Sequence, residues 1–207
     1  ILNTEVGPIY VAKNAEIMEG SLIRGGLALC ENACVKMGAK IYGATSIGPY
    51  CKVGGELNNV IFQSFSNKGH DGFLGNSVIG EWCNLGADTN TSNLKNNYSS
   101  VKTYSYIDKT EVQTDIQFMG LFMGDYSKSG INTMFNTASC IGVCCNVFGS
   151  GFPGKHIPSF SWVSSDQTTP FELKKSITAA NNMMNRRNLK MEQNDLDIFS
   201  HLSSSQP

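Results

Sequence analysis

Charged side chains are scarce in this sequence, since Asp, Glu, Lys and Arg together make up 16% of its 207 residues. Typical soluble domains carry about 25%. Sixteen basic and 17 acidic residues give a formal net charge of -1, so no overall field attracts nucleic acid or an anionic membrane surface. The 21 glycines are an unusually large share. These features argue against a helix bundle.

Several targeting and cofactor signals are also missing. No apolar run approaches the roughly 20 residues of a membrane span, and the amino terminus lacks the pattern of a signal peptide. The seven cysteines include no Cys-x-x-Cys pair, which favours reduced cytoplasmic thiols. His70, His156 and His201 are the three histidines, and they lie too far apart for one zinc site. We therefore predict a cytoplasmic protein with no metal, no membrane contact and no nucleic-acid partner.

An apolar residue recurs at every sixth position near the start of the chain, at Val11, Ile17, Ile23, Leu29, Val35, Ile41, Ile47 and Val53. The period returns within residues 73–85 and 123–147. A six-residue period fits neither a helix nor the alternation of a single strand. It is typical of the hexapeptide parallel β-helix, in which three hexads form one triangular coil. Stacked coils need few charged side chains, which explains the composition.

Two stretches break the six-residue period. We predict loop excursions at residues 54–72 and 92–122 within a β-helix domain that spans residues 1–162. Residues 163–207 are predicted to be a linker and a helical tail. In that tail Leu173, Ile177, Ala180 and Met184 follow helical spacing, and Asp195 to Leu202 indicates a second helix. The simplest role of the tail is to pack against the coils or cap them.

His70 has the most informative setting of any titratable residue, in the run Gly69-His70-Asp71-Gly72 where the coil resumes. Flanking glycines let a backbone approach closely, and an imidazole can accept a proton from an incoming nucleophile. No Gly-x-Ser-x-Gly elbow occurs. The residues suit a direct transfer that uses a base and oxyanion donors, although a lone histidine is also compatible with a structural role.

The run GHDGFLGNSVIGEWCNLGAD (residues 69–88), followed by Thr89, Asn93, Lys95 and Lys102, resembles one known family. It is the acetyltransferase half of the bifunctional UDP-N-acetylglucosamine pyrophosphorylase and glucosamine-1-phosphate N-acetyltransferase. The resemblance is greatest to its Bacteroidetes-type variant and to archaeal sugar-phosphate nucleotidylyltransferases with an acetyltransferase tail. The likeness extends from about Val11 to about Trp162. It implies a left-handed all-β helix, acetyl-CoA as co-substrate and a homotrimer. It further implies an amino-sugar phosphate acceptor, with glucosamine 1-phosphate as first choice.

The resemblance also implies roles for individual residues. His70 matches the general base, Ala87 the backbone N–H donor to the oxyanion, and Asn93 an asparagine that holds the reacting groups. Substrate contacts are implied for Asn84, Lys95, Lys102, Phe73, Asn58 and Tyr42. Acetyl-CoA contacts are implied for Ala87, Gly130, Gly149, Ser150 and Lys155.

Tyr42 and Asn58 are departures from the family, since they stand where an Arg and a Lys usually bind the sugar phosphate. Losing two cations from a phosphate clamp is costly unless others replace them, and Lys68, Lys95 or Arg24 are candidates. Two alternatives stay open. One is an acyltransferase with another amino-sugar or sugar-nucleotide acceptor, and the other is a noncatalytic module of a sugar-phosphate nucleotidylyltransferase.

The chain contains nothing that fits the nucleotidylyltransferase half of the bifunctional relatives, and its first residue is Ile1 rather than Met. We therefore expect the chain to be a processed protein or an excised piece of a longer one. Either a nucleotidylyltransferase half was removed, or the protein never had it.

Overall fold

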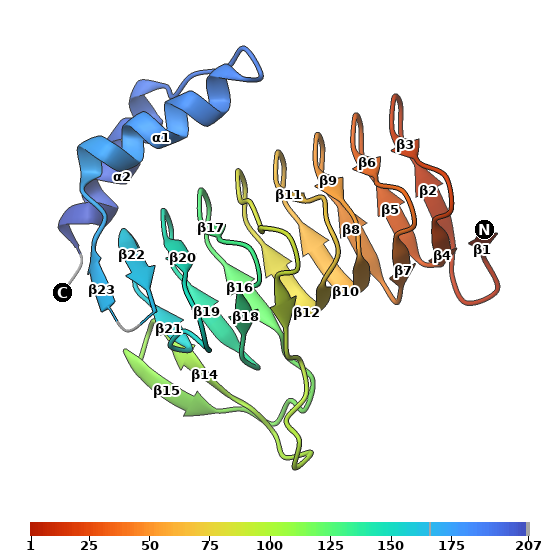
Figure 1. Ribbon diagram of the computed structural model, residues 1–207, viewed down its shortest axis with the longest axis horizontal. Coiled ribbons are helices and arrows are strands. Elements are labelled where there is room, and N and C mark those ends of the chain that lie inside the picture. The colour runs from red at the N-terminus through yellow and green to blue at the C-terminus, as the bar shows by residue number, and fades with distance from the viewer. Residues whose placement is uncertain (166, 206–207) are drawn as a thin grey trace.

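A computed structural model describes residues 1–165 and 167–205 as a stack of triangular coils with two helices folded against it (Figure 1). Successive coils pair in parallel. In the regular part the paired residues are 18 positions apart, as in Leu22 with Lys40 and Cys34 with Lys52, so one coil is three hexads. The predicted left-handed parallel β-helix with a C-terminal helical appendage is confirmed.

Most coils contribute a short strand to each of three faces. The first face holds β1 (Leu2–Asn3), β4 (Leu22–Arg24), β7 (Lys40–Tyr42), the starts of β10 (Glu56–Phe62) and β12 (Phe73–Ile79), β13 (Asn90–Thr91) and β18 (Met134–Phe135). The second holds β2 (Ile9–Val11), β5 (Leu27–Leu29), β8 (Thr45–Ile47), the ends of β10 and β12, β16 (Leu121–Met123), β19 (Ser139–Ile141) and β21 (His156–Ile157). The third holds β3 (Glu16–Ile17), β6 (Cys34–Val35), β9 (Lys52–Val53), β11 (Asn67–Lys68), β17 (Lys128–Ser129), β20 (Asn146–Phe148), β22 (Ser161–Ser164) and β23 (Gln167–Pro170).

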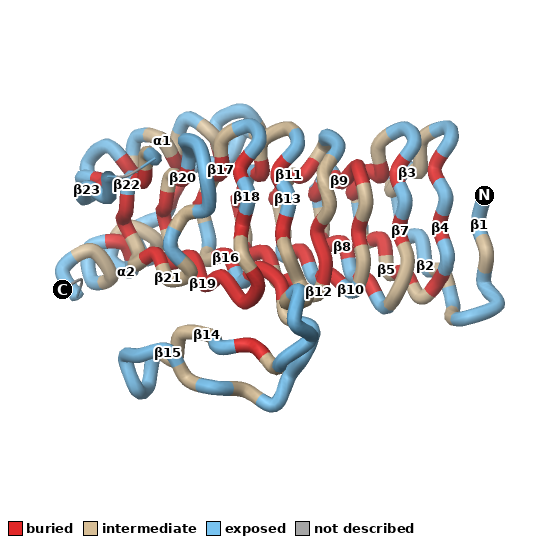
Figure 2. Tube along the Cα trace, turned by 60° about the horizontal axis from the view of Figure 1, so that its bottom comes forward, coloured by how far each residue is buried: buried red, intermediate tan, exposed pale blue. Residues whose placement is uncertain are grey.

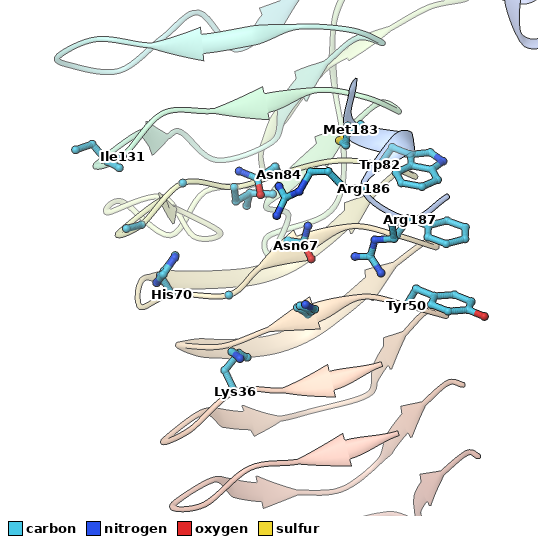
Figure 3. A pocket seen from close by; sticks show the side chains of 16 residues that line it. Lys36, Tyr50, Asn67, His70, Trp82, Asn84, Ile131, Met183, Arg186 and Arg187 are labelled. Carbon is cyan, nitrogen blue, oxygen red and sulfur yellow. The ribbon is translucent and has the colours of Figure 1, made fainter. Parts of the chain in front are cut away.

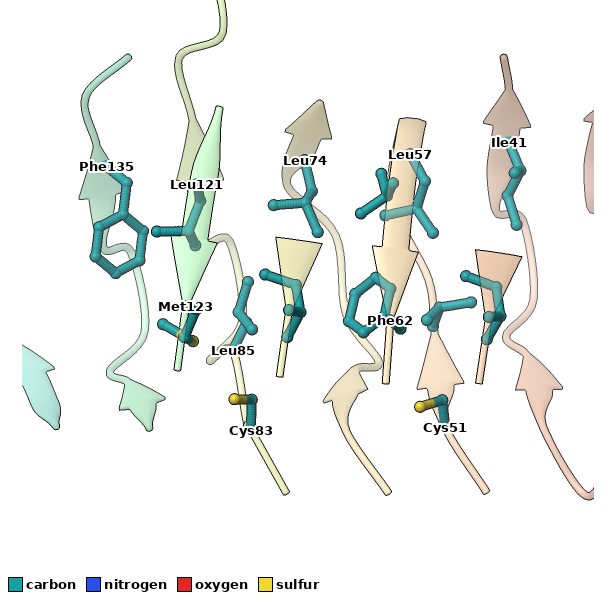
Figure 4. Packing of buried hydrophobic residues seen from close by; sticks show 14 of the residues in the cluster. Ile41, Cys51, Leu57, Phe62, Leu74, Cys83, Leu85, Leu121, Met123 and Phe135 are labelled. Atoms are coloured by element: carbon teal, nitrogen blue, oxygen red, sulfur yellow. The ribbon is translucent and has the colours of Figure 1, made fainter. Parts of the chain in front are cut away.

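The predicted anchors form the core inside the triangular stack (Figures 2 and 4). Leu29, Val35, Ile47 and Val53 are completely buried. Val11, in contrast, is 43% exposed because the first coil has a neighbour on one side only. The anchors therefore stabilise the fold most in the middle of the stack, where each contacts the coil before and the coil after it.

The loop excursion predicted at residues 54–72 is wrong, because this segment forms another coil of the stack. β10 pairs with β7 and β8 before it and with β12 after it, and β11 pairs with β9. The spacing of paired residues falls from 18 to 15 between Val53 and Lys68. A shortened coil shifts the anchors out of the six-residue period without leaving the fold.

The second excursion does leave the coils, between β13 and β16. It contains an antiparallel hairpin of β14 (Lys102–Ser105) and β15 (Thr110–Gln113), which lies beside β19 and β21 below the stack in Figure 1. Tyr104 stacks on His156 of β21 with ring centroids 3.4 Å apart. The excursion is thus fastened to the later coils.

The turn between the second and third faces forms an aromatic corner, defined by Tyr50, Phe65, Trp82 and Tyr126. Their rings stack in succession at centroid distances of 5.0, 4.2 and 6.4 Å. All four residues have positive φ, between 57° and 62°, a conformation that costs an ordinary residue about 1–2 kcal/mol. The stacked rings help to offset that cost.

The tail packs on the aromatic corner and runs back along the stack (Figure 1). β23 first pairs with β22 in antiparallel fashion, so the predicted boundary at residue 162 falls inside a strand. Helix α1 (Leu173–Asn185) and helix α2 (Gln193–Ser204) follow. Apolar residues of the two helices and of the connection between them bury Trp82, Cys144 and Phe160 of the coils: Ala180, Met184, Met191 and Phe199.

Candidate active site

A groove of about 780 Å³ crosses the third face from the aromatic corner to the turn that carries His70 (Figure 3). The end of α1 and the residues after it form its upper wall. Three predicted site residues, His70, Asn84 and Ala87, line it together. It also contains four basic side chains, Lys36, Lys52, Arg186 and Arg187, and we call it the basic groove.

Lys68 organises the turn that presents His70. Its side chain points into the stack at an anchor position, paired with Val53, and is 1% exposed. Its Nζ donates hydrogen bonds to the carbonyl oxygens of His70 and Asp71 at 2.9 and 3.1 Å. Burial lowers the pKa of Lys68 to about 8. Its three contacts, the last to Gly54 at 3.5 Å, rule it out as a free phosphate ligand.

Gly55 makes room for the Lys68 ammonium. A Cβ at this position would lie 2.9 Å from Lys68 Nζ and 2.7 Å from the carbonyl oxygen of Gly72, and the φ of Gly55 is +70°. Both the space and the backbone conformation therefore require glycine. His70 itself is exposed, and its imidazole forms no hydrogen bond with any residue in the described ranges.

Ala87 lies in the next turn along the stack. Its carbonyl oxygen accepts a hydrogen bond from Asn132, and its neighbour Asp88 donates to the carbonyl of Asp71. The N–H of Ala87 donates to no residue within 1–165 or 167–205. A backbone N–H held in a rigid turn and directed at a groove can stabilise a developing oxyanion.

Asn84 projects outward from the third face between β11 and β17, which it joins through isolated bridges to Asn67 and Lys128. Asn67 lines the same groove. Its Oδ1 is buried and has no hydrogen-bond partner in the described structure. The two asparagines thus lie side by side on the floor of the groove, as Figure 3 shows.

Four other predicted residues belong to the first face. Tyr42 and Asn58 are register partners there, and the Tyr42 hydroxyl donates to Glu56 at 2.6 Å. Phe73 and Asn93 meet above Gly75, where a Cβ would lie 2.6 Å from Phe73 Cζ and 2.7 Å from Asn93 Nδ2.

Asn93 is held in place by Asn76, because its Nδ2 donates to Asn76 Oδ1 at 2.7 Å. None of Tyr42, Asn58, Phe73 and Asn93 lines the basic groove. A single chain therefore divides the predicted substrate residues between two faces of the coil.

The predicted lysines form a third group near the excursion. Lys155 Nζ lies 3.4 Å from the carbonyl oxygen of Lys102, and Lys95 Nζ donates to the carbonyl oxygen of Ser100 at 2.8 Å. Burial lowers the pKa of Lys155, with Lys95 and Lys102 as further contributors. Within one chain these lysines do not reach the basic groove. Arg24 projects from the first face and does not line it either.

The remaining predicted acetyl-CoA residues follow the edge of the stack beyond Ala87. Gly86 and Gly130 lie in successive turns, since a Cβ at Gly86 would clash with the Gly130 carbonyl. Gly149 and Ser150 line a small separate hollow further along. Together with His70 and Ala87 these turns form one continuous edge between the third and first faces.

His70 separates two regions of opposite charge. On one side is the basic groove, whose lining contains no acidic residue. On the other is a hollow of about 320 Å³ lined by His70, Asp71, Ala87 and Asp88. An acceptor that carries both an anionic group and an amine would find complementary charge on the two sides.

The buried thiols are unsuited to nucleophilic catalysis. Burial raises the pKa of Cys51 and Cys83 to about 12 and that of Cys145 to about 11, and a thiolate is the reactive form. No metal-binding group of three or more His, Cys, Asp or Glu side chains occurs in the described part of the chain. A helix long and apolar enough to cross a membrane is also absent from that part.

Sequence reasoning missed the four basic residues of the groove. Lys36 and Lys52 follow the register of the third face, so their common side could be read from the repeat. Arg186 and Arg187 lie more than a hundred positions after His70, and only the docking of the tail brings them to it.

Comparison with known proteins points in the same direction as the residue pattern. No protein-family model matches the chain. The bifunctional protein GlmU of Synechococcus elongatus is 24% identical over 162 residues, covering 75% of this chain and 32% of that protein. GlmU of Methanocaldococcus jannaschii is 32% identical over 94 residues, covering 45% and 22%. The chain therefore spans about a third or less of these relatives.

Among solved structures, the polySia-specific acetyltransferase NeuO covers 77% of this chain and 82% of its own, with 11% identity and a TM-score of 0.28. The resemblance predicted from the sequence is confirmed at low identity: about three quarters of this chain is similar to part of the bifunctional GlmU proteins.

Proposed function

We propose that this chain is an acetyltransferase that moves an acetyl group from acetyl-CoA to the amine of a sugar phosphate, with glucosamine 1-phosphate as the first acceptor to test. One observation carries the proposal: His70 lies between a basic groove and an acidic hollow. Beside it is the backbone N–H of Ala87, which donates no hydrogen bond within the described residues. The similarity to GlmU proteins supports it.

In the proposed reaction the acceptor amine attacks the thioester carbonyl directly. The new N–C bond forms, His70 removes a proton from the amine, and the N–H of Ala87 stabilises the oxyanion. The C–S bond then breaks, and the CoA thiolate leaves and takes up the proton that His70 removed, which returns His70 to its starting state. Asn84 orients the acceptor on the groove floor. No side chain is acylated, in keeping with the high pKa of the buried thiols.

The exposure of His70 favours a site completed by a second copy of the chain. Its imidazole lacks a partner in the described residues, and the predicted substrate residues of the first face and of the excursion do not share its groove. A threefold arrangement of coils would bring faces of neighbouring chains together. The homotrimer, a fused nucleotidylyltransferase domain and a cytoplasmic location all belong to this proposal.

The test is a thiol-release assay with acetyl-CoA and a panel of amino sugars and their 1-phosphates. His70→Gln is expected to lower kcat by at least about 100-fold, the usual contribution of a general base. His201→Gln, on the exposed surface of α2, serves as the matched control and should retain full activity.

The two alternatives predict different results in the same experiment. Activity confined to another amino sugar or a sugar nucleotide would replace the acceptor and keep the reaction class. Failure of acetyl-CoA to bind at all would favour a noncatalytic module. Wild-type kcat in His70→Gln would contradict the assignment of the base.

A further inference from the structure

The basic groove contains four cations and no counter-ion. Lys36 and Lys52 project from the third face, and Arg186 and Arg187 from the end of the tail. The ion pair present within residues 1–165 and 167–205 joins Lys175 to Glu172, outside the groove. Four like charges around one hollow repel one another unless an anion occupies it.

The end of helix α1 does not account for the two arginines. Cations near a helix C-terminus commonly bind its free carbonyl groups. Here neither guanidinium donates a hydrogen bond to a carbonyl of the described chain. Figure 3 shows both side chains directed away from the tail, toward Asn67 and Asn84 on the groove floor.

Arg187 lies beside the aromatic corner. Its Cζ lies 5.7 Å from the centroid of the Phe65 ring, and Phe65 is itself stacked between Tyr50 and Trp82. Because these two rings cover both faces of Phe65, the guanidinium lies beside the edge of the ring, and its donors stay free for a ligand.

Asn67 provides an independent sign of a ligand. Its buried Oδ1 lacks a donor, which costs about 1–3 kcal/mol if nothing in the bound state supplies one. Because this oxygen is closed to solvent, a bound molecule reaches it only if the Asn67 side chain turns toward the groove. A hydroxyl or an amide N–H of the ligand would then supply the donor.

We infer that the basic groove is a phosphate-binding site assembled from the coil and the tail, in which Lys36, Lys52, Arg186 and Arg187 hold the phosphate of a phosphorylated substrate. Its place beside His70 gives it a role in catalysis that rests on the proposed function. The cations of this site lie on the third face and in the tail, whereas Tyr42 and Asn58 on the first face supply none. Arginine binds phosphate oxygens with two parallel hydrogen bonds, which suits the two tail arginines to this role.

Two substrates could supply the phosphate, the amino-sugar phosphate or CoA. The experiment measures binding by calorimetry, with no acetyl transfer involved, for two pairs of ligands: glucosamine 1-phosphate against glucosamine, and CoA against pantetheine. The test variant is Arg186→Gln/Arg187→Gln. Its matched control is Lys174→Gln/Lys190→Gln, which removes the same charge from exposed positions of the same tail.

The test variant is expected to bind one phosphorylated ligand at least 10-fold more weakly, with the control unchanged. The affected ligand identifies the source of the phosphate. Lys36→Gln/Lys52→Gln should produce the same loss without altering the tail, which guards against a simple failure of tail docking.

Equal affinity in the test and control variants would overturn the inference, as would wild-type protein that binds neither phosphorylated ligand more tightly than its phosphate-free counterpart. Phosphate-dependent binding without any acetyl transfer would instead defeat the proposed function and leave the phosphate site standing.

Discussion

At the scale of single residues, Lys68 shows how the coil prepares the His70 turn. Lysine is rarely buried, yet here it occupies an inward position. The equivalent positions of the two preceding coils hold Val35 and Val53. Its hydrogen bonds to backbone carbonyls fix the path of residues 69–72. The buried ammonium group of Lys68 thus fixes the conformation of the turn that carries His70.

We predict that Lys68→Met lowers the free energy of unfolding by about 1–3 kcal/mol, because it leaves the carbonyls of His70 and Asp71 without donors. The difference in unfolding free energy between wild type and Lys68→Met should also depend on pH. The pKa of Lys68 is about 8 in the folded chain against an ordinary value of 10.5. The unfolded chain therefore binds more protons between these two values, so the stability contributed by Lys68 rises with pH across that window.

Urea unfolding of wild type and Lys68→Met from pH 7 to pH 10 checks this prediction. Lys52→Met, at an exposed position of the neighbouring coil, is the control and should follow the wild-type slope. Parallel stability curves for wild type and Lys68→Met would show that Lys68 is not the titrating group.

At the scale of elements, the tail joins the coils through a second apolar cluster. Phe199 of α2 is 3% exposed and meets Tyr126 and Phe160 edge to face, at centroid distances of 5.0 and 5.6 Å. Trp82 lies in the same cluster. The position of Arg186 and Arg187 depends on this contact.

We expect Phe199→Ala to weaken the tail contact by about 3–5 kcal/mol, the usual cost of removing a buried phenyl group. The coils should remain folded while Trp82 gains access to water. The measurement is tryptophan fluorescence in a Trp162→Phe background, where a red shift and easier quenching by iodide report an undocked tail. Ile198→Ala, 56% exposed on the same helix, should leave the spectrum unchanged.

The elements also show where sequence reasoning succeeds and where it stops. Anchors such as Leu29 and Ile47 define the coil because their spacing is a local property of the chain. The coil at residues 54–72 could not be predicted, because its shortened turns break the six-residue period of apolar residues. Its backbone pairing with the neighbouring coils is nevertheless retained. The position of Arg187 depends on packing between distant segments, which no local pattern contains.

At the scale of the whole molecule, stability is distributed along the stack like that of other repeat proteins. Leu57, completely buried in a middle coil, contacts coils on both sides. We predict that Leu57→Ala costs about 2–5 kcal/mol. Val11→Ala, in the partly exposed first coil, should cost about 1 kcal/mol or less.

Hydrogen exchange of the two variants checks this difference. Leu57→Ala should raise exchange in the coils on both sides of the substitution, and Val11→Ala in the first coils alone. Uniform acceleration along the chain in both variants would mean that the stack unfolds as one unit rather than coil by coil.

The backward path of the tail also has a consequence during protein synthesis. Coils can stack in the order in which they leave the ribosome, since each needs only the one made before it. The groove beside His70, however, gains Arg186 and Arg187 only after more than a hundred further residues have been translated. A nascent chain that stops before them can possess a sound coil stack and still be unable to hold its anionic ligand, so ligand binding reports synthesis of the tail.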